Sequence, residues 1–408
     1  MPTMVEPIRV LVCGAGSASH ALAGIISMHP GVELRVFIDK ADKVCRWRDQ
    51  MNSHGLTVTF WNENNDRVKF VANPFLVTHN PEEAARHCDL IILALPAFLH
   101  WQYLKLLAPY IEQRTIIVGL PGRSGFEFDV RNALEPKVNT CVVINFESLP
   151  WICRLIELGK TVNILGTKNQ LAGALQGDLT QVRLANPVGC LQSLLGELPK
   201  LVVSGHLLGV TLMSPGAYSH PPILYGRWKD WNGNPLEQPP LFYHGIDEYT
   251  AELVGKISEE ALKISYWLTA EFADVDLSQV IPMYDWEIIH YGNYIKDRTN
   301  LMTAIRTNSR YEGITHPMLP TIDGKYMPNF NQRFLTEDVP FGLVVIRGIA
   351  ELAGVQTPYM DTVISWCQNK MEKEYLVGSR LVGKDLATTR CPQRYGFKTL
   401  ADILTNNL

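Results

Sequence analysis

A glycine-rich segment near the N-terminus has the spacing of a dinucleotide-binding loop. Residues 10–24, VLVCGAGSASHALAG, pass from β-branched residues through Gly14-x-Gly16-x-x-Ser19 into an alanine-rich stretch. Gly14 would permit a tight turn, and Gly16 would let a pyrophosphate approach the N–H groups that open a helix. Serine at the third position costs little, because that position serves helix–strand packing. The segment predicts a cofactor site over residues 14–19, with Gly14, Gly16, Ser17, Ala18 and Ser19 as cofactor-binding residues.

An acidic residue follows at the distance expected for ribose recognition. Asp39 ends the next β-rich run, residues 32–39, and is 23 positions beyond Gly16. Its carboxylate would accept hydrogen bonds from the adenosine ribose and repel a 2′-phosphate, which favours NAD(H) over NADP(H). Lys40 keeps that preference moderate. The alternative is a structural turn followed by a surface aspartate.

A histidine with a constrained backbone is a candidate for proton transfer. In SHPPILYGRW, residues 219–228, His220 is followed by two prolines. Imidazole titrates near neutrality, which suits proton transfer during hydride chemistry. A core or helix-capping role is the alternative, since ten other histidines have an equal claim.

A second charged segment, PNFNQRFLTEDVPFG at residues 328–342, contains an arginine and two acids. Thr336, Glu337 and Asp338 precede a proline, a pattern typical of the cap and first turn of a helix. Arg333 could hold a phosphate or a carboxylate, or lie in solvent. Spacing alone leaves both alternatives open.

The first 200 residues alternate short β-rich runs with amphipathic stretches. The runs at 89–97, 114–122, 140–147 and 160–167 are apolar without alternation, as expected when helices cover both faces of a parallel sheet. This order predicts an α/β domain of the Rossmann type, with a doubly wound and mostly parallel sheet, over residues 1–206.

The pattern becomes helical near residue 206. Apolar residues recur every three or four positions over 247–272, with Glu/Lys pairs between them, and 339–355 and 361–376 are similar. The connecting segments are rich in proline, tryptophan and tyrosine. Residues 207–408 therefore predict a mostly α-helical second domain.

Composition limits the possible partners. The 408 residues are 46% hydrophobic and 19% charged, and the formal net charge of −4 leaves no basic stripe for nucleic acid or anionic membranes. The longest apolar run, 90–99, is interrupted by Pro96 and is too short to cross a bilayer. The N-terminus has no charged-then-apolar leader, and the eight cysteines form no CxxC or zinc spacing. We expect a cytoplasmic protein without a metal, a nucleic-acid partner or a membrane partner.

Several motifs together resemble the opine dehydrogenases, most closely the octopine, tauropine and alanopine enzymes of marine invertebrates. They occur in the family's order along the whole chain. They are VCGAGSASHALAG (12–24), GLPGRSGFEF (119–128), FESLPWICR (146–154), SHPPILYGRW (219–228), RFLTEDVPFG (333–342) and GKDLATTRCPQRYGF (383–397).

The resemblance implies a Rossmann domain and a helical domain that close on an active site in the cleft between them. It implies NADH-dependent reductive condensation of an amino acid with pyruvate to an N-(1-carboxyethyl) amino acid, which regenerates NAD⁺ in anaerobic glycolysis. The substrates are small molecules, and we expect a monomer. One group must take and return protons as amine and keto acid form a carbinolamine and then an imine.

The resemblance also assigns roles to single residues. His220 matches the catalytic histidine, Asp338 the aspartate that orients and charges it, and Arg333 the arginine that reaches across the cleft to the cofactor. The further residues assigned in this way are Pro96 at the cofactor and Arg123, Glu147, Ser148 and Tyr218 at the substrate.

Arg123 departs from the pattern of the octopine-forming enzymes, which have an uncharged polar residue there and a threonine in place of Ser148. A fixed guanidinium would repel the guanidinium of arginine, so we expect taurine, alanine, glycine or β-alanine instead. The alternatives are that Arg123 faces solvent and that arginine is the substrate. Another two-domain NAD-dependent dehydrogenase, for a 2-hydroxy acid or a sugar phosphate, would need a catalytic lysine on a helix near the junction, and no good candidate is present. A redox-sensing protein that binds NAD without turnover would not need His220 paired with Asp338.

Overall fold

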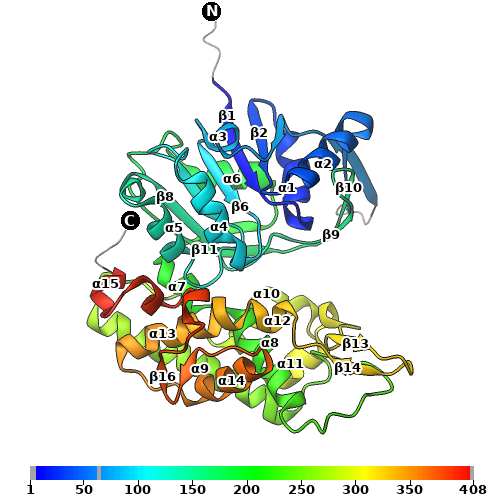
Figure 1. Cartoon of the computed structure of the whole chain (residues 1–408), viewed down its shortest axis with the longest axis vertical. Coiled ribbons are helices and arrows are strands. Elements are labelled where there is room, and N and C mark those ends of the chain that lie inside the picture. The colour runs from blue at the N-terminus through cyan, green and yellow to red at the C-terminus, as the bar shows by residue number, and fades with distance from the viewer. Residues whose placement is uncertain (1–5, 62–65, 405–408) are drawn as a thin grey trace, which may run out of the picture. The chain divides into compact units, whose positions relative to one another are not determined.

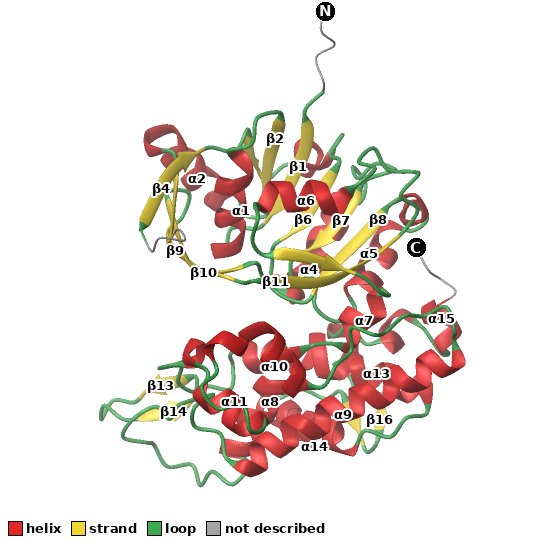
Figure 2. Ribbon diagram, turned by 180° about the vertical axis from the view of Figure 1, so that it is seen from behind, coloured by secondary structure: helices red, strands yellow, loops and turns green. Residues whose placement is uncertain are grey.

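The computed structural model describes residues 6–61 and 66–404, and the chain forms two compact units that divide between Leu207 and Leu208 (Figures 1 and 2). Among the described residues, no helix has both the length and the apolar character needed to cross a membrane.

The first unit is built on an eight-stranded sheet in the order β12-β11-β8-β7-β6-β1-β2-β5. The six strands from β5 to β8 are parallel and have the order of a dinucleotide-binding fold, whereas β11 pairs antiparallel with β8. The predicted Rossmann architecture is confirmed. The strands are β1 (Ile8–Cys13), β2 (Val32–Phe37), β5 (Leu76–Thr78), β6 (Leu90–Leu93), β7 (Ile116–Gly119), β8 (Val142–Phe146), β11 (Gln170–Gln176) and β12 (Lys200–Val203).

Helices cover both faces of this sheet. The two views place α4 and α5 over one face and α1 and α6 over the other (Figures 1 and 2). Every residue of β6, β7 and β8 is accordingly buried, as their unbroken apolar sequences predict. The helices of this unit are α1 (Ser17–Ser27), α2 (Ala41–His54), α3 (Pro81–Ala85), α4 (Ala97–Leu107), α5 (Phe126–Leu134) and α6 (Pro187–Leu195).

A second, four-stranded sheet was not predicted. Its order is β4-β3-β10-β9, from β3 (Leu56–Trp61), β4 (Arg67–Ala72), β9 (Trp151–Glu157) and β10 (Thr161–Thr167). The run at 160–167 belongs to this sheet and not to the parallel one, which corrects its predicted place. β4 alternates exposed with more buried residues, so one of its faces is covered.

The second unit is helical, as predicted. Its longest helix, α9 (Glu248–Glu271), is capped by Asp247, whose carboxylate accepts from the Thr250 N–H at 2.8 Å. The other helices are α7 (Leu207–Leu212), α8 (Pro215–Trp228), α10 (Met283–Tyr291), α11 (Leu301–Thr307), α12 (Arg333–Thr336), α13 (Val344–Ala353), α14 (Pro358–Lys370) and α15 (Leu400–Leu404). Two short hairpins join β13 (Met318–Pro320) to β14 (Tyr326–Pro328) and β15 (Leu376–Val377) to β16 (Arg380–Leu381).

Candidate active site

The glycine loop connects the end of β1 to the start of α1. Gly14 has φ +117°, and a Cβ there would lie 2.5 Å from Leu95 Cδ2 and 2.7 Å from Ser19 Oγ. Both the backbone conformation and the available space therefore require glycine.

Gly16 is glycine for a different reason. Its φ is −90°, it is exposed, and a Cβ there would meet no atom of the chain within 4 Å. The fold itself does not require glycine at this position. The missing side chain instead leaves space over the N-terminus of α1, where partly buried Ser17 and Ala18 present N–H groups suited to a pyrophosphate. These residues fit a bound dinucleotide.

A buried histidine that sequence analysis missed holds this loop in place. His20 Nδ1 donates to the Gly16 carbonyl at 2.8 Å, and Nε2 accepts from the Gly159 N–H at 2.8 Å. Burial lowers its pKa to about 4, and the ring stacks on Trp47 at 3.7 Å, so the imidazole is neutral. Ser17 Oγ also accepts from the Leu155 N–H at 3.0 Å. The β9–β10 hairpin therefore anchors the loop through partners 138 and 139 residues away along the chain.

The Ser19 side chain has a packing role, and its assignment to the cofactor stays a prediction. The residue is fully buried, and its hydroxyl donates to the Ala94 carbonyl at 3.1 Å. It joins α1 to the end of β6 and does not reach the surface of the loop.

Asp39 is held in position by α4. Its Oδ1 accepts from the Tyr103 hydroxyl and its Oδ2 from Gln102 Nε2, both at 2.9 Å, while Lys40 Nζ lies 3.6 Å from Oδ2. Its side chain is 11% exposed, so it is not the surface aspartate of the alternative interpretation. Each carboxylate oxygen can accept more than one hydrogen bond, which leaves capacity for ribose hydroxyls. Pro96 is the N-cap of this same helix.

The predicted substrate residues of the first unit follow neighbouring strands. Arg123 comes after β7, and Glu147 and Ser148 come directly after β8, so they lie at the carboxyl edge of the parallel strands, where the glycine loop also lies. Arg123 has φ +67°, and its carbonyl accepts from Asn145 Nδ2 at 3.1 Å. Glu147 is buried.

In the second unit, the structure brings His220 and Asp338 together. Nδ1 lies 2.7 Å from Oδ2, and the two side chains are 15% and 4% exposed. An ionised carboxylate can only accept, so Nδ1 carries the proton and Nε2 is the acceptor of the neutral ring. His220 lies within α8 and stacks on Phe334 at 4.2 Å; it is neither a capping nor a fully buried core residue.

A tyrosine that sequence analysis did not single out lies beside the other nitrogen of this imidazole. The Tyr243 hydroxyl lies 2.7 Å from His220 Nε2 and donates to it when the ring is neutral. The Tyr243 ring stacks on Tyr311 at 4.0 Å, and the Tyr311 hydroxyl donates to Glu287 Oε1 at 2.8 Å. Burial raises the pKa of Glu287 to about 7. Tyr243 lies in a connecting segment that sequence analysis described only as aromatic.

Two backbone features place Asp338 beside α8. Pro340 has no N–H to donate, and two hydrogen bonds around it span five residues, from the Asp338 N–H to Arg333 O at 3.2 Å and from the Leu343 N–H to Asp338 O at 3.0 Å. The resulting π-helix, Val339–Leu343, corrects the predicted cap: the Asp338 side chain makes no capping hydrogen bond and faces His220. A Cβ at Gly342 would lie 2.5 Å from that of Ala217, so glycine allows α8 this close.

Arg333 and Tyr218 have different surroundings. Arg333 Nη2 lies 2.5 Å from Glu337 Oε2; the arginine side chain is 57% exposed and the glutamate 2%. Glu337 therefore orients a guanidinium that still faces solvent. Tyr218 is fully buried, and its hydroxyl donates to the Leu212 carbonyl. Its side chain packs within the second unit, and its assignment to the substrate stays a prediction.

Comparison with known proteins agrees with this arrangement. The family "NAD/NADP octopine/nopaline dehydrogenase, alpha-helical domain" matches residues 203–371. The tauropine dehydrogenase of Arabella iricolor is 44% identical over 97% of this chain and 100% of its own length. The chain belongs to the opine dehydrogenase family. The close relatives are NAD-dependent oxidoreductases, which removes the hydroxy-acid, sugar-phosphate and non-enzymatic alternatives.

Two further opine dehydrogenases bear on the substrate. The opine dehydrogenase of Haliotis discus hannai is 43% identical over 99% of this chain and 100% of its own length. The solved octopine dehydrogenase in complex with NADH and L-arginine is 41% identical, covers 98% of both chains, and has a TM-score of 0.93. Relatives named for different products are thus about equally similar to this opine dehydrogenase.

Proposed function

We propose that this opine dehydrogenase condenses pyruvate with a small amino acid or taurine, reductively and at the expense of NADH. The observation that carries the proposal is the His220–Asp338 pair at 2.7 Å in the helical unit. We assign residues 1–206 to cofactor binding and residues 207–408 to catalysis.

The first unit supplies the residues that would hold the cofactor. The open space over Gly16 suits the pyrophosphate, and the Asp39 carboxylate suits the ribose. A carboxylate that α4 holds in this way would repel a 2′-phosphate, which favours NADH over NADPH. A solved relative at 41% identity is a complex with NADH. When bound, NADH supplies the hydride that reduces the imine.

The second unit supplies the proton transfers. His220 Nε2 takes a proton from the attacking amine and returns it to the carbonyl oxygen, which becomes the hydroxyl of the carbinolamine. It then takes the second proton from the nitrogen and gives it to that hydroxyl, which leaves as water and gives the imine. Asp338 fixes the tautomer through Nδ1 and stabilises the imidazolium that forms between the transfers of each pair. Tyr243 is a positioning residue, because its hydroxyl holds Nε2 in a defined orientation until substrate takes its place.

The preference for small or acidic amines rests on Arg123. Its guanidinium, in the loop that follows β7, would repel the guanidinium of arginine and attract a carboxylate or sulfonate. Glu147 lies at the end of the neighbouring strand and reduces this effect. Similarity alone does not select the amine, since both a tauropine and an octopine dehydrogenase are close relatives.

The test is an NADH-oxidation assay with pyruvate and one amine at a time: taurine, alanine, glycine, β-alanine or arginine. We expect NADH loss only when both substrates are present, and a product with the mass of the N-(1-carboxyethyl) amine. The four small amines should have a higher kcat/KM than arginine, and Arg123→Gln should move the preference toward arginine. A preference of the unmodified enzyme for arginine would make it an octopine dehydrogenase.

A further inference from the structure

A lysine that sequence analysis did not select lies among the predicted substrate residues. Lys168 directly follows β10, and its Nζ lies 2.5 Å from Ser148 Oγ. Its backbone N–H donates to the Pro150 carbonyl at 3.1 Å, and this hydrogen bond holds Lys168 beside the segment that contains Ser148. Glu147 and Arg123 both act electrostatically on its ammonium group. These four residues, Arg123, Glu147, Ser148 and Lys168, are called the carboxyl-edge cluster below.

The partner of Lys168 is unusual for a partly buried cation. A buried ammonium is costly unless it is paired with an acceptor that compensates for lost hydration. The Ser148 hydroxyl is neutral, and an ammonium has three donors. Burial lowers the pKa of Lys168 to about 8, in spite of the opposing effect of Glu147. The surroundings therefore leave this cation undercompensated.

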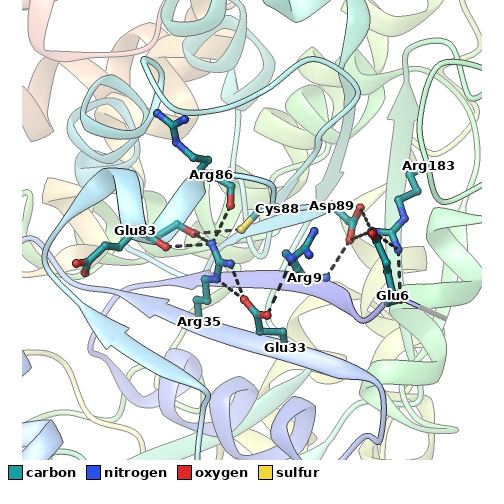
Figure 3. A network of polar contacts seen from close by, with 10 residues as sticks. Glu6, Arg9, Glu33, Arg35, Glu83, Arg86, Cys88, Asp89 and Arg183 are labelled. Atoms are coloured by element: carbon teal, nitrogen blue, oxygen red, sulfur yellow. Dashed lines mark hydrogen bonds and ion pairs between the residues drawn. The ribbon is translucent and has the colours of Figure 1, made fainter. Parts of the chain in front are cut away.

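The amino edge of the same sheet shows the usual solution. There, Arg35 lies 2.5 Å from Glu33 and donates to the carbonyls of Glu83 and Arg86, and Arg183 lies 3.2 Å from Asp89 (Figure 3). Each of these two guanidinium groups is paired with a carboxylate. Within the carboxyl-edge cluster, two cations, Arg123 and Lys168, accompany the carboxylate of Glu147.

We propose that Lys168, together with Arg123, binds the acidic group of the amine substrate, a carboxylate or a sulfonate. This inference rests on the proposed function and names the part of the substrate that the first unit recognises. The cluster carries a net charge of +1 when all three groups are ionised, so an anionic end is attracted and a guanidinium is repelled. Ser148 holds the ammonium in position, and the acid group would replace the hydration that burial removes.

The experiment compares Lys168→Met, Lys168→Arg and a control, Lys160→Met. Lys160 directly precedes β10 and pairs with Glu157 at 2.9 Å, so Lys160→Met removes a lysine next to the same strand but outside the cluster. For each protein, KM and kcat are measured for taurine (sulfonate), β-alanine (carboxylate) and pyruvate at saturating NADH. NADH affinity and the melting temperature report on folding.

Lys168→Met should raise the KM for taurine and β-alanine about 10-fold or more, as expected for the loss of a charge-assisted hydrogen bond. The KM for pyruvate and the affinity for NADH should change less than twofold, Lys168→Arg should retain most of the amine affinity, and Lys160→Met should match the unmodified enzyme. An effect on only one of the two amines would show which acid, sulfonate or carboxylate, the cluster recognises.

Two results would overturn the inference while leaving the proposed function intact: unchanged amine KM values in a folded Lys168→Met enzyme, or a rise in the pyruvate KM alone, which would assign Lys168 to the keto acid. If none of the amines supported NADH oxidation by the unmodified enzyme in the presence of pyruvate, the proposed function itself would be wrong, and this inference would be wrong with it.

Discussion

The glycine loop of the first unit consists of backbone groups at one strand–helix junction, whereas the His220 group of the second unit consists of side chains from separate segments. In the loop, Ser19 is five residues from Gly14, and His20 is four residues from Gly16. Phe37, Ala94, Leu95 and the hairpin anchors are the more distant contacts of the turn. In the His220 group, Asp338 is 118 residues and Tyr243 is 23 residues away along the chain.

This difference shows how the two halves of the function depend on the fold. Binding at the loop uses N–H groups that any sequence with the right turn would present, so the fold of β1 and α1 is nearly sufficient. Proton transfer needs an imidazole between a carboxylate and a hydroxyl, which requires α8 and the π-helix to approach closely at Ala217 and Gly342. The two regions should therefore fail independently when they are mutated.

The largest effect on turnover outside His220 itself is expected at Asp338. Asp338→Asn keeps the shape but cannot stabilise an imidazolium, and its amide can reverse the tautomer. We expect kcat to fall about 100-fold or more, with NADH affinity unchanged. Steady-state kinetics and a fluorescence titration of NADH measure both quantities.

Asp361→Asn is the matched control for that change, because Asp361 also pairs with a basic side chain of the second unit, Arg347 at 2.5 Å. Its turnover should stay within about threefold of the unmodified enzyme. A near-normal kcat of the Asp338→Asn enzyme would show that the His220–Asp338 pair has only a structural role.

The next largest effect separates the two glycines of the loop. Gly16→Ala should weaken NADH binding about 10-fold or more, because a methyl group would occupy the space over the start of α1, and it should leave the melting temperature unchanged. Gly14→Ala should lower both the affinity for NADH and the melting temperature, because the φ of +117° and the 2.5 Å approach to Leu95 disfavour any side chain at this position. Calorimetry and NADH titration distinguish the two. Equal NADH affinity in Gly16→Ala would move the cofactor away from this loop.

A smaller effect is expected at Tyr243. Tyr243→Phe removes one hydrogen bond from Nε2 but keeps the stacking on Tyr311, so kcat should fall about 3- to 10-fold. Tyr249→Phe, at an exposed position of α9, is the control and should have no effect. A loss in NADH affinity instead of kcat in Tyr243→Phe would contradict its role beside His220.

The parts of the molecule that could be predicted are those in which local sequence determines local structure. The Rossmann strands and α9 follow from apolar patterns, and the glycine loop follows from spacing. The residues that were missed, His20, Lys168 and Tyr243, have partners between 20 and 139 residues away along the chain. No local pattern marks such pairs, because only the tertiary fold brings them into contact.

The same limit applies to the direction in which a side chain points. Ser19 and Tyr218 lie in motifs that carry function, yet their side chains point into the protein and bond to backbone carbonyls. Asp338 has the sequence context of a cap, but the lack of an N–H at Pro340 changes the hydrogen-bond spacing to five residues and redirects the chain. A resemblance identifies the motif, and only the structure identifies which side chain of it is available.

The smallest effect on turnover is expected at Glu287, whose influence is on stability. Its pKa is raised to about 7 by burial, so the folded state binds more protons than the unfolded state between about pH 4.5 and 7. The free energy of unfolding therefore falls as pH rises through this interval. Glu287→Gln should remove that decrease and be more stable than the unmodified enzyme at pH 8, by about 1–3 kcal/mol.

Urea unfolding at pH 5 and pH 8 measures this difference. Burial lowers the pKa of His20 to about 4 and so has the opposite effect on stability, which is why the comparison must be made between the two proteins and not along one curve. Identical pH dependence in both proteins would contradict the role assigned to Glu287.

The central claim is that cofactor binding and proton transfer are carried by different units, and His220→Ala tests it most directly. The measurement is a paired one on the same protein: the dissociation constant of NADH by fluorescence titration, and kcat with pyruvate and taurine. We predict an NADH affinity within twofold of the unmodified enzyme and a kcat lower by about 10²–10⁴-fold. Near-normal turnover, or a loss of NADH binding as large as the loss of turnover, would contradict the account.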